Sequence, residues 1–138
     1  SRHFKEAKLY TAEPNGLDDT ARSLAVGTRQ TNDPSARSIC DAIVTPSPGL
    51  LTFPIVQSKA AGGKVVTDEE ALSAMKTAWD YFKLTVEPGG AVALAASLKQ
   101  EVIASHTGNK RKTVVAILSG GNCDHAIFAQ ALAAPALI

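Results

Sequence analysis

The spacing of hydrophobic and polar residues predicts strands and helices that alternate along the chain. Near the start, a short strand over residues 7–12 precedes a helix over residues 18–26, which Gly27 closes in the left-handed capping position. Near the end, an unbroken apolar run over residues 114–118 is typical of a strand buried on both faces of a parallel sheet, and a helix over residues 123–133 follows it. The alternation predicts the α/β class, with a mostly parallel sheet flanked by helices.

The middle of the chain continues this alternation around one long irregular segment. Residues 28–48 are rich in Thr, Ser, Asn, Asp and Pro, which predicts a loop. A helix is expected over residues 50–60, a strand over residues 64–66 after a turn at a glycine pair, and an alanine-rich helix over residues 89–105. Because ligands of α/β proteins bind beyond the carboxyl ends of parallel strands, chemistry is expected in the turns there.

The clearest helix start is at Thr67, whose hydroxyl can cap the helix while Glu70 reaches back to the Thr67 amide. Beyond this capping box, large apolar residues recur at helical spacing and predict a stripe in the core or at an interface. These residues are Leu72, Met75, Trp79 and Phe82.

Composition and charge narrow the classes of partner. The 138 residues carry 14 Lys and Arg against 13 Asp and Glu, a formal charge of +1. This balance provides no basic surface for nucleic acid or an anionic membrane, and no apolar run approaches the roughly 20 residues of a transmembrane helix. Cys40 and Cys123 lack metal or redox spacing, which favours reduced thiols and leaves a disulfide between them open. With no secretory leader pattern at the N-terminus, we expect a cytoplasmic protein.

Three turns carry residues suited to chemistry, and each also has a purely structural interpretation. The motif SGGN (residues 119–122) lets the backbone approach a flat ligand, or makes a tight strand-to-helix turn. Glu87 precedes a helix that Pro88 can start, where an acid also complements the helix dipole. The motif EPNGLDD (residues 13–19) offers oxygen ligands for Mg²⁺ or Ca²⁺, or forms a charged helix start.

Five motifs in a fixed order resemble one known family. They are TAEP with the DD that follows it (residues 11–19), SICDA (38–42), PSPGLLTFP (46–54), VEPGGAVA (86–93) and LSGGN (118–122). Together they resemble the C-terminal half of the pyridoxal-phosphate (PLP) dependent threonine/serine dehydratases. That group includes serine racemase and the hydroxyaspartate dehydratases and has the tryptophan-synthase-β-like fold, type II. Residues 1–138 are therefore expected to be the C-terminal portion of the large PLP-binding domain.

The resemblance implies a cofactor site around the SGGN turn. Ser119 matches the serine whose hydroxyl bonds the pyridine nitrogen of PLP, and Glu87 matches an acid near the ring edge. A neutral hydroxyl makes the ring a weaker electron sink than a carboxylate would, which favours β-elimination over transamination. The other residues expected at the cofactor are Gly120, Gly121 and Asn122, and Ala42, which stands where many relatives have glycine.

The resemblance also implies a structural divalent cation, Mg²⁺, Ca²⁺ or Mn²⁺. Glu13, Asp19 and the backbone carbonyl of Leu17 match the positions that hold this ion in many members. The ion would brace the turn and act on catalysis only indirectly.

The resemblance places three further parts of the catalyst before Ser1. These are the Schiff-base lysine, the loop that binds the substrate carboxylate and the glycine-rich phosphate loop. No C-terminal regulatory domain is expected in the chain. We therefore expect an incomplete catalyst, inactive alone, whose partners are the missing N-terminal half, a second copy in a dimer when intact, and a small amino-acid substrate.

The predicted function is that of a PLP-dependent ammonia-lyase (dehydratase), which converts threonine, serine or 3-hydroxyaspartate into a 2-oxo acid and ammonia. Two alternatives stay open. One is a part of a serine- or aspartate-type racemase with the same site, and the other is a non-catalytic binding or interaction module that keeps the fold.

Overall fold

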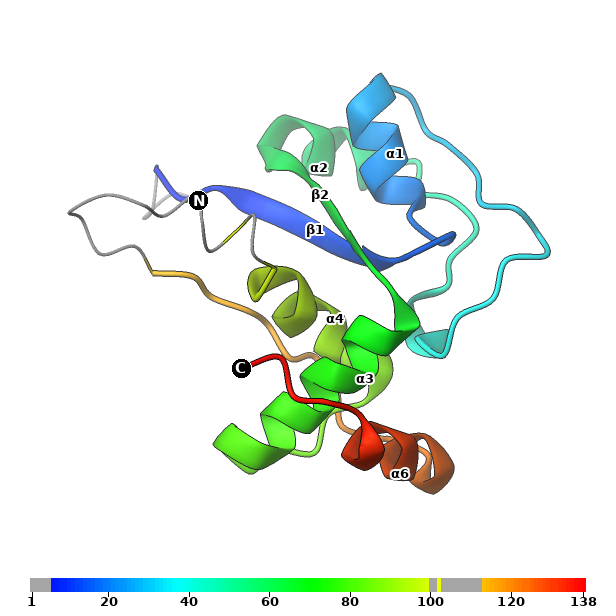
Figure 1. Ribbon diagram of the computed structural model, residues 1–138. Helices are drawn as coiled ribbons and strands as arrows, with labels where there is room; N and C mark the ends of the chain where they lie inside the picture. Colours follow the sequence, from blue (N-terminus) through cyan, green and yellow to red (C-terminus); the bar gives the residue numbers. More distant parts are fainter. Residues whose placement is uncertain (1–5, 100–101, 103–112) are drawn as a thin grey trace.

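Figure 1 shows the chain, for which a computed structural model describes residues 6–99, 102 and 113–138. No helix within these residues is long and apolar enough to cross a membrane. In chain order their regular elements are β1 (Leu9–Pro14), α1 (Asp19–Val26), a 3-10 turn (Asp41–Ile43), α2 (Phe53–Lys59), β2 (Ala60–Val66), α3 (Asp68–Thr77), a π-helical turn (Ala78–Phe82), α4 (Pro88–Ser97) and α6 (His125–Ala133).

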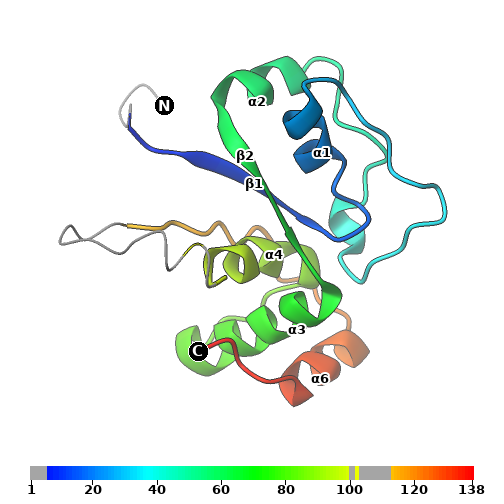
Figure 2. The same ribbon diagram turned by 45° about the horizontal axis from the view of Figure 1, so that its top comes forward.

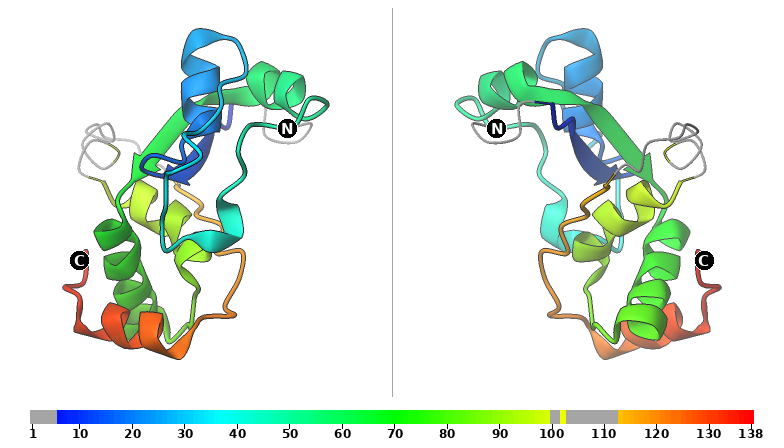
Figure 3. Two further views of the ribbon diagram at one scale, coloured as in Figure 1. Left: turned by 90° about the vertical axis from the view of Figure 1, so that its right-hand side faces the viewer. Right: turned by 90° about the vertical axis from the view of Figure 1, so that its left-hand side faces the viewer.

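The two strands form a parallel pair, with Pro14 opposite Val66 at the carboxyl end. α1 and α4 pack on this pair from opposite sides, as Figures 1 and 3 show. The contact with α1 is close because Gly63 has no side chain, and a Cβ atom there would collide with Ala21 of α1. Just beyond the strands, the Asn15 N–H donates to the Val66 carbonyl at 2.8 Å. The start of the EPNGLDD turn is therefore fixed at the edge where both strands end.

The core lies among α3, α4 and α6, below the strands in Figure 2. Met75 of α3 and Val92 of α4 are buried, and the alanines of both helices allow a close approach. The ring of Trp79 meets the ring of Phe128 of α6 edge-on, with centroids 5.5 Å apart, a favoured aromatic geometry. Cys40 from the long loop is fully buried in the same core, so the loop is tied to the helical layer.

Several predicted elements are confirmed together with the local signals that predicted them. The helix expected over residues 18–26 is α1, and Gly27 ends it in the left-handed conformation, with φ of 79°. At the start of α3 the Glu70 N–H donates to the Thr67 hydroxyl while the Thr67 N–H donates to the Glu70 carboxylate, so both halves of the capping box form. Residues 28–48 are irregular except for the 3-10 turn, and the two cysteines are free thiols.

Other boundaries differ from the prediction. β1 begins and ends two residues later than the strand predicted over residues 7–12. β2 includes the glycine pair that was expected to form a turn before it, because position 63 is a strand position against which α1 packs. Of the predicted helices, α2 is shorter than residues 50–60, and α4 ends at Ser97. The helix predicted over residues 89–105 includes residues 100–101 and 103–105, which lie outside the described part of the chain.

The apolar stripe predicted after the capping box spans α3 and the π-helical turn, and only part of it lies in the core. Met75 is fully buried and Leu72 packs against the core, but Trp79 is 40% and Phe82 54% exposed. The reason is the π-helical turn at Ala78–Phe82, which changes the direction of side chains that an ideal α-helix would align.

The strand predicted over residues 114–118 is wrong for this structure. The segment runs without the hydrogen-bonding pattern of a strand, and Val115 and Ile117 are 80% and 74% exposed. A strand exists only through its neighbours, and within the described residues the sheet contains β1 and β2 alone. The apolar run therefore has the composition of a buried strand without the partner that would make it one.

Candidate functional site

The SGGN turn lies against the segment that leads into α4. The Glu87 N–H donates to the Gly120 carbonyl at 3.1 Å, which joins the two segments. The glycines allow this contact. A Cβ atom on Gly121 would lie 2.7 Å from the Thr85 carbonyl oxygen, and one on Gly120 would collide with the Glu87 carboxylate. The predicted neighbours Glu87 and Gly120 are thus in direct contact.

Two polar side chains of the turn are available to a ligand. Ser119 and Asn122 are exposed, and neither side chain has a hydrogen-bond partner within the described part of the chain. Glu87 occupies the position before α4 but makes no side-chain capping bond, so its carboxylate is not committed to the helix. The arrangement brings a hydroxyl, an amide and a carboxylate to one short stretch of surface.

Ala42 reaches the same end of α4 from the long loop. A Cβ atom on Gly89 would lie 3.5 Å from the Ala42 side chain, in ordinary van der Waals contact. The loop is fixed there because the Ser38 hydroxyl and the Ile39 N–H both donate to the Asp68 carboxylate of α3. The structure therefore brings Ala42, the start of α4 and the SGGN turn together.

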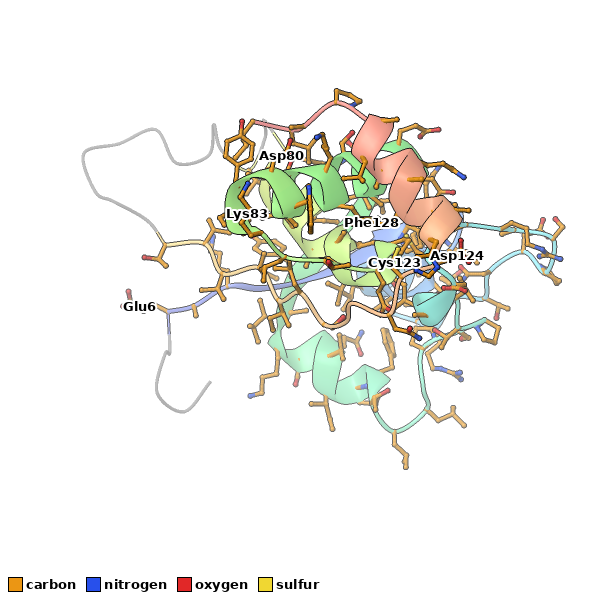
Figure 4. All side chains as sticks on the ribbon, turned by 90° about the horizontal axis from the view of Figure 1, so that it is seen from below. Glu6, Asp80, Lys83, Cys123, Asp124 and Phe128 are labelled. Atoms are coloured by element: carbon orange, nitrogen blue, oxygen red, sulfur yellow. The ribbon has the colours of Figure 1, made fainter. Side chains whose placement is uncertain are left out.

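The sequence did not predict that Cys123, which follows the SGGN turn, lies near Glu87. Burial raises the pKa of the Cys123 thiol, and the negative charges of Asp124 and Glu87 raise it further. Figure 4 labels Cys123 and Asp124 where the turn enters α6, with Phe128 one turn along that helix. The only available signal was the position of Cys123 directly after the motif, and it says nothing of Glu87, which is distant in sequence.

The EPNGLDD turn is organised by Glu13. Its carboxylate accepts hydrogen bonds from the Thr20 N–H at 3.1 Å and the Ala21 N–H at 2.7 Å, so it satisfies two of the free amides at the start of α1. Asp19 is 1% exposed, and its Oδ1 atom accepts from the Asn32 side-chain amide at 2.6 Å. Its Oδ2 atom is buried and has no partner within the described residues. Leu17, between them, is buried as well.

The electrostatics of this turn favour a cation. Burial raises the pKa of Glu13, and the nearby Asp19 charge raises it further, against the lowering effect of the hydrogen bonds from Thr20 and Ala21. An unpartnered buried carboxylate oxygen beside a second carboxylate fits a hard divalent ion. Among the described residues no three acidic, histidine or cysteine side chains are placed to hold a metal, so further ligands would be backbone oxygens or water.

Two cavities lie along the long loop, and neither includes the SGGN turn. One of them, of about 430 Å³, is bordered by Leu17 and Asn32 and therefore adjoins the EPNGLDD turn. Of the candidate cofactor residues, Ser119, Asn122 and Ala42 are exposed, whereas Glu87 and Gly120 are half-buried.

The fold and the two turns define a member of the PLP-dependent enzymes. Residues 1–120 match the family model described as "Pyridoxal-phosphate dependent enzyme", and the chain belongs to this family. Its α/β fold with a parallel strand pair is that of the fold-type-II enzymes, which confirms the predicted fold class. The chemistry at the SGGN turn fits this cofactor, because the unpartnered hydroxyl of Ser119 is a neutral donor for a ring nitrogen.

The relatives include both racemases and dehydratases. The chain is 42% identical over 118 residues to the serine racemase of Dictyostelium discoideum, covering 85% of this chain and 35% of that protein. It is 32% identical over 120 residues to the β-hydroxyaspartate dehydratase of Paracoccus denitrificans, covering 86% and 36%. The solved threonine deaminase of T.th. superposes with a TM-score of 0.74 at 33% identity, covering 85% and 37%. The chain thus spans about a third of the length of these relatives.

Proposed function

We propose that the chain is the C-terminal portion of a PLP-dependent ammonia-lyase that converts threonine, serine or 3-hydroxyaspartate into a 2-oxo acid and ammonia. The observation that supports this proposal most is the exposed, unpartnered Ser119 hydroxyl in a turn whose next residue, Gly120, lies against the Glu87 carboxylate. The similarity to the β-hydroxyaspartate dehydratase of P. denitrificans and to the solved threonine deaminase supports the reaction class.

The residues of the SGGN turn would hold and tune the cofactor ring. Bound PLP supplies an electron-withdrawing ring that stabilises negative charge at the substrate α-carbon. The Ser119 hydroxyl would donate a hydrogen bond to the ring nitrogen without supplying a negative charge that keeps this nitrogen protonated. The glycines would let the backbone come close to the ring, with Asn122 and Ala42 beside it and Glu87 near its edge. This neutral support favours loss of a β-hydroxyl over transamination.

The EPNGLDD turn would hold Mg²⁺, Ca²⁺ or Mn²⁺ through Glu13, Asp19 and the Leu17 carbonyl. The buried and unpartnered Asp19 Oδ2 atom supports this assignment. Because Glu13 already binds the first amides of α1, an ion there would brace the junction between β1 and α1. Its effect on the reaction would be indirect.

The remaining groups of the catalyst would come from an N-terminal half that carries the Schiff-base lysine, the phosphate loop and the substrate-carboxylate loop. The chain alone is then inactive, and the intact enzyme is a cytoplasmic homodimer. The chain covers about a third of the length of its relatives, and this supports a catalyst divided between the chain and an N-terminal half.

A second candidate is a racemase that uses the same site. The similarity to the serine racemase of D. discoideum, at 42% identity, favours it. The two functions differ in the fate of the substrate, because a racemase retains the β-hydroxyl and inverts the α-carbon.

Native mass spectrometry of the protein purified from its own cells tests the proposal. We expect the added mass of PLP and a companion polypeptide with the lysine. The same material should then release a 2-oxo acid and ammonia from a β-hydroxy amino acid. Ser119→Ala should lower this rate about tenfold or more, the cost of leaving a polar group of the site unpaired. Ser58→Ala, on the exposed surface of α2, is the matched serine control.

Each alternative has its own result. Inversion of serine that exceeds 2-oxo acid formation would assign the racemase function. A chain that carries neither PLP nor a companion, and that gains no activity when PLP is added, would make it a non-catalytic module and overturn the proposal.

A further inference from the structure

Asn32 is a buried polar residue of the long loop that contacts one of the proposed cation ligands. It is 5% exposed. Its side-chain nitrogen donates to Asp19 Oδ1 at 2.6 Å and to the Thr45 carbonyl at 2.9 Å. Both hydrogens of this amide therefore form hydrogen bonds, one with Asp19 and one with the backbone of the loop.

Arg22 fixes which end of the Asn32 amide faces Asp19. One guanidinium nitrogen, Nη2, donates to Asn32 Oδ1 at 2.5 Å, and Nε donates to the Asp18 carboxylate at 3.3 Å. A guanidinium can only donate, so the Asn32 oxygen must face Arg22 and the nitrogen must face Asp19. The Nη1 and Nη2 atoms of Arg22 also donate to the Thr31 carbonyl, at 3.3 and 3.4 Å, which holds the arginine over the start of the loop.

The result is an asymmetric Asp19 carboxylate. One oxygen is held by a correctly oriented amide, and the other is buried without a partner in the described residues. A buried acceptor without a partner costs about 1 to 3 kcal/mol. An arrangement that served only to anchor the loop would not require that cost, because Asn32 already bonds the Thr45 carbonyl.

We propose that Arg22 and Asn32 are positioning residues that hold Asp19 with Oδ2 presented to the divalent cation. This inference rests on the cation site of the proposed function and adds to it the residues that orient the ligand. Without the pair, no hydrogen bond from the described residues fixes the orientation of the Asp19 carboxylate, and cation affinity falls even though every ligand is still present. The expected loss is about 10- to 100-fold, as for other groups that orient metal ligands.

Mn²⁺ titration followed by electron paramagnetic resonance tests the inference on the full chain. The free Mn²⁺ signal gives the Kd directly and needs neither PLP nor activity. Asn32→Ala should raise the Kd about 10- to 100-fold, and Arg22→Ala about two- to tenfold, the value of one net hydrogen bond. Asp19→Asn should abolish binding.

Ser38→Ala is the matched control. It removes one of the two hydrogen bonds that anchor the same loop on Asp68 and does not touch Asp19, so it perturbs the loop away from the cation ligand. Circular dichroism and the Tm of each variant, measured in chelator, verify that the comparison is made between folded proteins. Arg22→Ala, at a more exposed side chain, keeps the test informative if Asn32→Ala does not fold.

The outcomes separate the inference from the cation site itself. Weaker Mn²⁺ binding in Asn32→Ala or Arg22→Ala, with Ser38→Ala within twofold of the wild type, supports the positioning role. The inference would be overturned, and the cation site retained, if Asp19→Asn abolishes binding while Asn32→Ala and Arg22→Ala bind Mn²⁺ as tightly as the wild type. If Ser38→Ala weakens Mn²⁺ binding as much as Asn32→Ala does, Asn32 only anchors the loop and the inference is overturned. A wild type that binds no Mn²⁺ would overturn both the site and the inference, and leave the PLP proposal to its own test.

Discussion

The two turns that carry the candidate functional residues are built in opposite ways. In the EPNGLDD turn the polar groups bond to nearby parts of the same chain: Glu13 to the start of α1, and Asp19 to Asn32. In the SGGN turn the side chains of Ser119 and Asn122 have no partner in the described residues. In the first turn, both Glu13 oxygens and Asp19 Oδ1 accept hydrogen bonds, and Asp19 Oδ2 has no partner in the described residues. The second is held by its backbone and leaves its side chains for a ligand.

The difference also concerns what each turn rests on. The EPNGLDD turn lies between β1 and α1, where the partners of its carboxylates are backbone amides and a loop amide. The SGGN turn rests on the start of α4, whose far side is packed in the apolar core with α3. Hydrogen bonds of its own carboxylates thus support the EPNGLDD turn, whereas a backbone hydrogen bond to the segment before α4 supports the SGGN turn.

The largest effect is expected from removing the centre of that core. Met75→Ala, at a fully buried side chain of α3, should lower the free energy of unfolding by about 2 to 5 kcal/mol. Urea denaturation followed by fluorescence of Trp79 measures this change, because the chain has one tryptophan and it lies in the helical layer. Leu84→Ala, at a residue 48% exposed, is the control and should cost much less. Similar losses in both variants would contradict the description of Met75 as the core of this region.

A smaller effect is expected where the long loop enters the core. Burial, with the charges of Asp68 and Asp41 adding to it, raises the pKa of the Cys40 thiol to about 11, from an ordinary value of 9.0. Below pH 9 the thiol is neutral in both states and its contribution to stability is complete. Between pH 9 and 11 only the unfolded chain ionises, so the free energy of unfolding should fall, by at most about 2 to 3 kcal/mol.

Cys40→Ala separates this effect from other alkaline titrations. The difference in the free energy of unfolding between wild type and variant should be constant below pH 9 and should shrink between pH 9 and 11. A difference that does not change with pH would show that the thiol is not buried and that the loop does not enter the core.

The smallest effect is expected at the junction between β2 and α3. Thr67→Ala removes the hydroxyl that accepts the Glu70 N–H and should lower stability by about 1 kcal/mol. Thr67→Ser keeps the hydroxyl and should restore most of the loss. Thermal unfolding of the two variants side by side measures this. A serine variant as unstable as the alanine variant would assign the effect to the lost methyl group instead of the cap.

Signals that act over a few residues were readable from the sequence. Gly27 ends α1 and Thr67 begins α3 as predicted, because a left-handed cap and a capping box depend only on neighbours along the chain. The order of the motifs predicted the family, which the match over residues 1–120 confirms. The roles of Ser119 and Asp19 stay predictions until cofactor and cation binding are measured.

Features that depend on distant segments were not readable. The apolar run over residues 114–118 has a strand composition but no strand neighbour in the described residues, and the glycine at position 63 of β2 is explained by the approach of Ala21. The proximity of Glu87 to Cys123 and the bond from Asn32 to Asp19 likewise join residues that no local pattern connects.

The sequence by itself determined the end of α1 at Gly27, the start of α3 at Thr67 and the residue types at the two turns, because these follow from local hydrogen bonding and from the chemistry of each side chain. The tertiary structure decided which of those residues meet, which apolar stretch becomes a strand, and which buried oxygen of Asp19 is left without a partner. These depend on packing and desolvation, which arise only when segments far apart in the chain are brought into contact.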